Sequence, residues 1–256
     1  MSELFHISPL LQALLATLLT WGVTALGAAL VLFTRRVKPL WMDALLAFGA
    51  GVMLASSYFS LLAPAIDTAQ TLRQAPWLVS TAGFISGGML LLGADRLLQP
   101  SALARQRRSI LLIGSITLHN IPEGMAIGVS FGALAASPDL AAAAWMLAIG
   151  IALQNFPEGA AVSLPLRREG MPRSRAFLWG QLSGVVEPIA GVLGCLLAVY
   201  MQSLLPFLLA FAAGAMVVVV IAELVPESQR SAHPSLMSLV TLAGFSLMML
   251  LDVALG

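Results

Sequence analysis

The heptapeptide LHNIPEG at residues 118–124 is followed by a second copy, LQNFPEG, at residues 153–159. Each copy lies inside a long apolar run and brings an amide and a carboxylate into it. Proline inside a helix removes one backbone hydrogen bond, so each copy also frees a carbonyl group, that of Leu118 or Leu153. Polar side chains and interrupted hydrogen bonding within apolar helices are typical of a membrane protein with a functional site near mid-membrane.

The composition around these motifs also indicates a membrane protein. Of the 256 residues, 59% are hydrophobic and 10% are charged, whereas about 25% are charged in a soluble domain. The sequence therefore predicts an all-α protein that spans the bilayer several times. Its one cysteine, Cys195, excludes an intrachain disulfide and a cysteine-based metal cluster.

Apolar stretches long enough to span the bilayer, which takes about 20 residues, recur eight times. They are separated by short polar or proline-containing breaks, which leave no room for a soluble domain. We therefore expect a single transmembrane domain over residues 1–256. Its predicted spans are 8–33, 40–66, 77–99, 109–133, 141–166, 176–201, 204–226 and 235–255.

The basic residues indicate how these spans are oriented. All but one of the 13 Lys and Arg residues follow odd-numbered spans, and Arg73 is the exception. Because short basic loops stay on the cytoplasmic side, both termini are predicted to lie outside. With short loops and no evident targeting segment, we expect a multi-pass protein of the bacterial inner membrane with both termini periplasmic.

Internal similarities predict inverted repeats. Residues 47–53 of span 2 resemble residues 210–216 of span 7, and residues 82–84 of span 3 resemble residues 243–245 of span 8. Spans 1–3 thus repeat as spans 6–8, and the odd offset makes the copies antiparallel, as it does for spans 4 and 5. Such repeats are typical of secondary transporters. Chance recurrence of small-residue packing motifs is the alternative for the span 2 and 7 match.

The polar side chains within the spans favour a metal site. His119 and Glu123 lie four residues apart on one helix face, and Gln154 and Glu158 repeat that spacing in span 5. With Glu187 in span 6, three carboxylates share one depth and need cations or protons. Imidazole, carboxylates and amides suit zinc, iron(II) or manganese. The alternative is that each is a buried polar group bonded to a neighbouring helix.

At these residues the chain resembles the ZIP family of metal transporters, in its eight spans, its outside termini and the His-Asn-x-Pro-Glu-Gly motif of span 4. Residues 51–60 also resemble span 2 of bacterial members. The resemblance implies a two-metal site and a protein that is not an enzyme. The first ion would contact Met53, His119, Glu123, Gln154, Glu158 and Glu187. The second would contact Asn120, Glu123, Asn155, Glu158 and Glu187.

The chain departs from the family pattern in two places. Many members have histidine at the position of Gln154, and an amide favours a broader range of ions that includes cadmium, iron(II) and manganese. The loop from Gln99 to Ser109 contains no histidine, unlike the long His-rich loop of many members. Asp95, Glu223 and Glu227 are expected near the cytoplasmic mouth, either as an exit site or as solvated interface residues.

The sequence therefore predicts a secondary transporter that takes zinc and related ions into the cytosol. The resemblance implies a homodimer and an elevator movement of spans 1, 4, 5 and 6 against spans 2, 3, 7 and 8. A metal channel, an exporter and an intramembrane metalloenzyme are the alternatives, although no H-E-x-x-H motif occurs. The expected partners are divalent metal ions and the lipid bilayer. We expect no nucleic acid, and no cofactor beyond the transported ion.

Overall fold

The computed structural model describes residues 8–33, 39–98, 108–168 and 170–255. Over these residues the chain is helical and contains no β-strand. The longer helices are α1 (Pro9–Phe33), α2 (Pro39–Ser56), α3 (Ala63–Thr71), α4 (Pro76–Leu98), α5 (Arg108–Gly132), α6 (Ala141–Arg168), α7 (Arg173–Leu182), α8 (Val186–Tyr200), α9 (Leu205–Val219), α10 (Val225–Gln229) and α11 (Pro234–Leu255). The short elements between them are η2 (Ser57–Leu62), η4 (Ala133–Ala135), η5 (Pro138–Leu140), η6 (Ser183–Val185), η7 (Gln202–Leu204) and η8 (Val220–Leu224).

Seven stretches of the described chain are long and apolar enough to cross a membrane. They correspond to α1, α2 with α3, α4, α6, α7 with α8, α9 with α10, and α11. The prediction of an eighth span rests on α5, which has 25 residues but carries Asn120 and Glu123 in its middle. The all-helical membrane fold is thus confirmed, and the count of eight stays a prediction.

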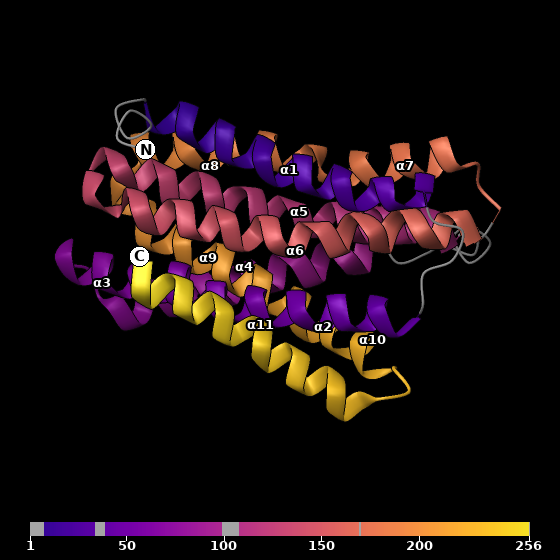
Figure 1. The fold of residues 1–256 in the computed structure, drawn as a ribbon. Helices are drawn as coiled ribbons and strands as arrows, with labels where there is room; N and C mark the ends of the chain where they lie inside the picture. The colour runs from indigo at the N-terminus through magenta and orange to yellow at the C-terminus, as the bar shows by residue number, and fades with distance from the viewer. Residues whose placement is uncertain (1–7, 34–38, 99–107, 169, 256) are drawn as a thin grey trace.

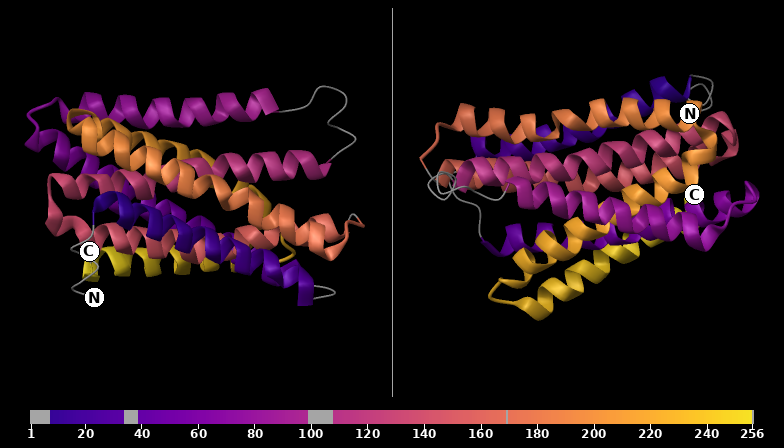
Figure 2. Two further views of the ribbon diagram at one scale, coloured as in Figure 1. Left: turned by 90° about the horizontal axis from the view of Figure 1, so that it is seen from above. Right: turned by 180° about the vertical axis from the view of Figure 1, so that it is seen from behind.

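The helices form two bundles that lie side by side (Figure 1). In the first bundle α1 packs along α6, and α5 packs along α8, with α7 beside α1. In the second bundle α4 packs along α9 and α2 packs along α11. Figure 2 shows the same arrangement from above and from behind. Each of these four pairs joins helices that are far apart in the sequence.

Glycine allows the paired helices to approach closely. In the first bundle, a Cβ atom at Gly27 of α1 would overlap the backbone carbonyl of Phe156 on α6. In the second, a Cβ at Gly87 of α4 would overlap the carbonyl of Phe211 on α9, and one at Gly214 would overlap that of Phe84. Backbone packed on backbone across small residues is how membrane helices associate without a hydrophobic driving force.

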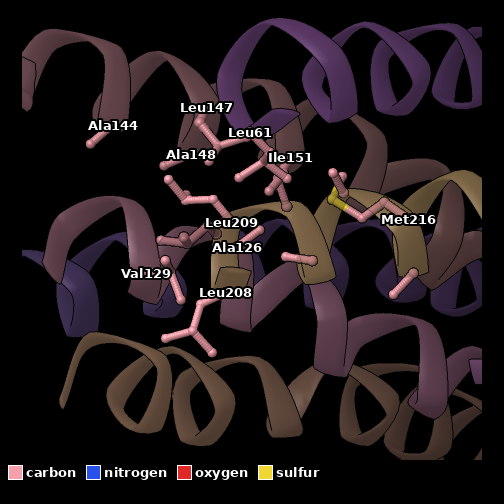
Figure 3. Packing of buried hydrophobic residues seen from close by; sticks show 14 of the residues in the cluster. Leu61, Ala126, Val129, Ala144, Leu147, Ala148, Ile151, Leu208, Leu209 and Met216 are labelled. Carbon is pink, nitrogen blue, oxygen red and sulfur yellow. The ribbon is translucent and has the colours of Figure 1, made fainter. Parts of the chain in front are cut away.

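Between the two bundles, the contacts are made by side chains. Leu147 and Ile151 of α6 share one buried apolar cluster with Leu208 and Leu209 of α9, as Figure 3 shows. A Cβ at Gly150 would meet the side chain of Met248 on α11 rather than a backbone atom. At these positions the face between the bundles is apolar, and Gly150 meets a side chain where the glycines within each bundle meet backbone.

Two of the membrane helices contain a π-helical segment, which the apolar pattern did not predict. Segment η2 lies between α2 and α3, and η8 lies between α9 and α10. A proline follows each segment closely, Pro64 in α3 and Pro226 in α10. A proline ring clashes with the carbonyl four residues earlier, which here belongs to Ser60 or Ala222, inside the π segment. The wider turn relieves that clash.

Candidate functional site

Buried polar side chains gather where α5, α6 and α8 of the first bundle meet. All are fully buried except Glu158, which is 6% exposed. Two helices contribute through the repeated motif, and the third contributes through its first turn. The residues are Asn120 and Glu123 of α5, Gln154, Asn155 and Glu158 of α6, and Glu187 of α8.

Glycine brings these side chains together by the same close packing that builds the bundles. A Cβ at Gly124 of α5 would overlap the backbone of Glu187 on α8. A Cβ at Gly159 of α6 would overlap the carbonyl of Thr24 on α1. Each glycine directly follows a glutamate of the repeated motif. That glutamate therefore lies next to a close contact between two helices. The Gly of N-x-P-E-G is thus a packing residue, and the Glu beside it belongs to the site.

Three amides of this cluster use their nitrogens as hydrogen-bond donors and leave their oxygens without a partner within the described chain. Nδ2 of Asn120 donates to the carbonyl of Ser183 at 2.8 Å, and Nε2 of Gln154 donates to Oε1 of Glu123 at 2.8 Å. Nδ2 of Asn155 donates to Glu187 at 2.9 and 3.0 Å. The oxygen of each amide is buried and has no hydrogen-bond partner among the described residues.

Two of the three carboxylates present an oxygen in the same way. In the part of the chain that the structure describes, Oε2 of Glu123 and Oε2 of Glu158 are buried without a donor. The carboxylates of Glu123, Glu158 and Glu187 are close enough to repel one another electrostatically. Buried oxygens without donors, grouped with mutually repelling carboxylates, are a set that a divalent cation would satisfy.

The described His, Cys, Asp and Glu side chains do not by themselves form a group of three that could hold an ion. A metal site in this cluster therefore also needs the amide oxygens and the two other predicted ligands, His119 and Met53. His119 lies in α5, but its side chain is outside the described residues. Met53 is fully buried on α2. It follows Gly49 by one helical turn, and a Cβ at Gly49 would lie 3.6 Å from Cβ of Gln154, so Met53 shares the face of α2 that meets α6.

The residues predicted for a cytoplasmic exit are not gathered into one site. Glu223 of η8 interacts electrostatically with Glu158. Glu227 of α10 accepts a 2.7 Å bond from Arg230, and both side chains are well exposed, at 58% and 77%. The side chain of Asp95 lies outside the described residues. Glu223 is thus the one described member of this set that faces the central carboxylates.

Sequence reasoning missed the threonines of α1. Thr20 Oγ1 donates to Glu187 Oε2 at 2.5 Å, and Thr24 Oγ1 lies 3.4 Å from Glu187 Oε1. A threonine pair four residues apart in an apolar helix was the available signal. Asp252 of α11, which accepts a 2.6 Å bond from Ser60 of η2, was also missed. A single carboxylate in the last apolar span could have revealed it.

Comparison with known proteins identifies the family. The family model described as ZIP Zinc transporter matches residues 99–252. Zinc transporter ZIP11 of Xenopus tropicalis is 39% identical, over 97% of this chain and 98% of the relative. Zinc transporter ZIPB of Bordetella bronchiseptica is 40% identical, over 92% and 79%. Zinc transporter ZupT of Escherichia coli is 32% identical, over 95% and 98%.

These matches cover nearly the whole chain and include the repeated motif on α5 and α6. The buried carboxylates and amides described above therefore lie within the part of the chain that matches zinc transporters. We conclude that the chain belongs to the ZIP family and is a metal transporter rather than an enzyme.

Proposed function

We propose that this protein is a secondary transporter that takes divalent transition-metal ions, zinc foremost, into the cytosol through a two-ion site in the membrane core. The observation that carries the proposal is the set of buried acceptor oxygens on α5 and α6 that have no donor within the described chain. Burying such groups in an apolar membrane is costly unless a partner compensates. One cation compensates several of them at once.

The ligands proposed for the two ions follow the family resemblance and the gathered side chains. The first ion contacts Met53, His119, Glu123, Gln154, Glu158 and Glu187. The second contacts Asn120, Glu123, Asn155, Glu158 and Glu187. Carboxylates shared by both ions allow two positive charges to lie close together. The oxygens without donors on Asn120 and Asn155 support a second ion, because both lie one residue beyond the ligands of the first.

The donor atoms support a substrate range broader than zinc alone. The described ligands without partners are all oxygens, from three amides and two carboxylates. Oxygen ligands suit harder ions such as manganese, whereas imidazole suits zinc, copper and iron. We therefore propose that zinc shares the site with cadmium, iron(II) and manganese.

We further propose that α5 is the eighth span. At 25 residues it is about 37 Å long at a rise of 1.5 Å per residue, which exceeds a hydrocarbon core of about 30 Å. The start of α1 and the end of α11 lie at the same end of the bundles (Figure 1), which supports an even number of crossings. The end of α6, which includes Arg167, and the start of α7 at Arg173 lie at the other end of the bundles. That end is then cytoplasmic. In the bacterial setting that the sequence predicts, both termini are periplasmic.

The proposal of inverted repeats gains support from matching positions in the second bundle. The π segments η2 and η8 both precede a proline. A Cβ at Gly51 of α2 would overlap the carbonyl of Thr241 on α11, and one at Gly214 of α9 would overlap that of Phe84 on α4. Gly51 and Gly214 are corresponding residues of the predicted repeat. Gly51 of span 2 meets span 8, and Gly214 of span 7 meets span 3, so the two contacts also correspond.

The two bundles support an elevator movement. All the proposed ligands except Met53 lie on the first bundle, and each bundle is held together by backbone contacts at glycine. Part of the face between the bundles is an apolar cluster of side chains. Such a face can slide without breaking a helix pair, so the first bundle would carry the ions past the second.

Zinc uptake into proteoliposomes tests the function. Glu123→Ala removes a ligand that both ions share, so uptake should fall to the level of empty vesicles while the protein still inserts. Asp139→Asn is the matched control, because Asp139 is an exposed carboxylate in η5. It should transport like the unchanged protein. Near-normal uptake by Glu123→Ala would overturn the proposal.

Preloading the vesicles with unlabelled zinc distinguishes a carrier from a channel. A carrier exchanges inner for outer ions, so preloading should accelerate the entry of labelled zinc. A channel would show no such stimulation, and an exporter would accumulate zinc only in vesicles of inverted orientation. The homodimer implied by the family stays a prediction.

A further inference from the structure

The carboxylate of Glu187 is held differently from the other two carboxylates of the site. Oε2 accepts from Thr20 Oγ1 at 2.5 Å and from Asn155 Nδ2 at 2.9 Å. Oε1 accepts from Asn155 Nδ2 at 3.0 Å and from Thr24 Oγ1 at 3.4 Å. Glu123 and Glu158 each keep an oxygen without a donor. Both oxygens of Glu187 thus accept hydrogen bonds from neighbouring side chains.

These bonds determine where Asn155 points. Its Nδ2 is directed at Glu187 and also lies 3.3 Å from the carbonyl of Thr20. With its nitrogen fixed on that side, its Oδ1 is turned away and has no hydrogen-bond partner. The chain of contacts therefore runs from α1 through Glu187 to the one oxygen of Asn155 that is available to an ion.

Helix α1 is itself held in a fixed register. Thr20 and Thr24 lie on one face of α1, four residues apart. A Cβ at Gly159 would overlap the carbonyl of Thr24, which packs α1 tightly on α6. Nε1 of Trp21 donates to the carbonyl of Gln181 at 2.9 Å, which ties α1 to α7. The two hydroxyls therefore reach Glu187 from a rigid support.

We propose that Thr20, assisted by Thr24, is a positioning residue that controls the second-ion position without touching an ion. It fixes Glu187, and Glu187 fixes Asn155. The inference rests on the proposed two-ion site. Partners that orient a metal ligand typically change metal affinity by about 10–100-fold when they are removed, so that is the loss expected at the second position.

Calorimetric titration of the full-length protein in nanodiscs with Zn²⁺ tests the proposal. The unchanged protein should bind two ions. Thr20→Val removes the hydroxyl and keeps the shape, so the second binding event should weaken about 10–100-fold. The first event should weaken less, because the first ion shares Glu187 but not Asn155. Thr20→Ser restores a donor and should restore the second event. Thr24→Val should show a smaller loss, because its bond is longer.

Thr17→Val is the matched control, because Thr17 is a buried threonine of α1 whose hydroxyl donates only to carbonyls of its own helix, those of Ala13 and Leu14. It should bind both ions normally. In an Asn155→Ala background, Thr20→Val should have a smaller further effect on the second event, since one of the two ligands that it positions is gone.

Three results overturn the proposal. They are an unchanged second event in Thr20→Val, an equal weakening of both events, and a full effect of Thr20→Val that persists without Asn155. If Thr20→Val fails to fold, Thr24→Val and Thr20→Ser decide by the same criteria. Binding of fewer than two ions by the unchanged protein would instead refute the two-ion site itself, so that the two failures are distinguishable.

Discussion

The two bundles differ most in the polar groups that they bury. The second bundle buries serines, among them Ser56, Ser57 and Ser228, whose hydroxyls bond to carbonyls of their own helices. The first bundle buries carboxylates, amides and threonines that bond from one helix to another. A hydroxyl that bonds within its helix is satisfied by local structure alone. Carboxylates and amides require partners from elsewhere, so the first bundle carries the chemistry and the second serves as its support.

The bundles resemble each other in how their helices pair, since both rely on glycine and backbone contact. Where the two bundles meet each other at the positions described above, the contacts are made by side chains. The comparison implies two rigid bundles that move against each other, and four experiments test this.

The largest effect is expected from a disulfide across the face between the bundles. Gly150→Cys with Met248→Cys, in a Cys195→Ala background, should stop uptake on oxidation, and a reductant should restore it. A Cβ at Gly150 would touch the Met248 side chain, so the two positions are adjacent. Uptake of labelled zinc measures the effect.

A disulfide within the second bundle is the control. A Cβ at Gly88 of α4 would lie 3.0 Å from Cγ2 of Val218 on α9, so Gly88→Cys with Val218→Cys should form a crosslink and leave uptake unchanged. Full transport with the first disulfide formed would exclude movement between the bundles.

A smaller effect is expected from adding a methyl group within a bundle. Gly124→Ala forces a Cβ into the backbone of Glu187, and overpacking of this kind costs about 1–3 kcal/mol. Gly214→Ala should cost a similar amount, but only Gly124→Ala should also impair zinc affinity. Thermal unfolding and calorimetry measure the two effects. Gly22→Ala, with no atom within 4 Å of the added Cβ, should change neither.

The ligand Gln154 should set ion preference within the first bundle. Gln154→His replaces an amide oxygen with imidazole, a better zinc ligand, so competition uptake should shift towards zinc over manganese by about 10-fold, or about 1.4 kcal/mol. Gln202→His in the exposed η7 segment should leave the preference unchanged. An unaltered preference in Gln154→His would mean that residue 154 does not touch the ion.

The smallest effect is expected from the one proposed ligand on the second bundle. Met53→Leu conserves volume, so stability should change by less than about 1.5 kcal/mol. It removes a soft thioether, so cadmium affinity should fall by a few-fold while manganese affinity stays constant. Met216→Leu, another fully buried methionine of that bundle, is the control. Equal losses for both ions would indicate a packing role for Met53.

The sequence predicted the helical membrane class and the family correctly, because the apolar runs and the repeated heptapeptide are local features. The burial of Glu123, Gln154 and Glu158 also follows from their positions in those runs. That these residues bind metal stays a prediction, as do the eight-span count and the inverted repeats.

The contacts that complete the site could not be predicted from the sequence. Thr17 and Thr20 are both buried threonines of α1, yet Thr17 bonds within its helix and Thr20 reaches Glu187. Which hydroxyl faces α8 depends on the rotation of α1 against its neighbours, and an apolar helix carries little pattern to fix that rotation. The π segments were missed for a related reason, since one wider turn barely alters the apolar run.

The pairing of helices distant in the sequence has a consequence for synthesis. The glycine contacts of α1 wait for α6, and those of α2 wait for α11, which is synthesised later still. Until then, Gly51 and its flanking surface face lipid or the translocation machinery rather than their partner. The helices of the first bundle are therefore all synthesised before α2 has its partner in the second bundle.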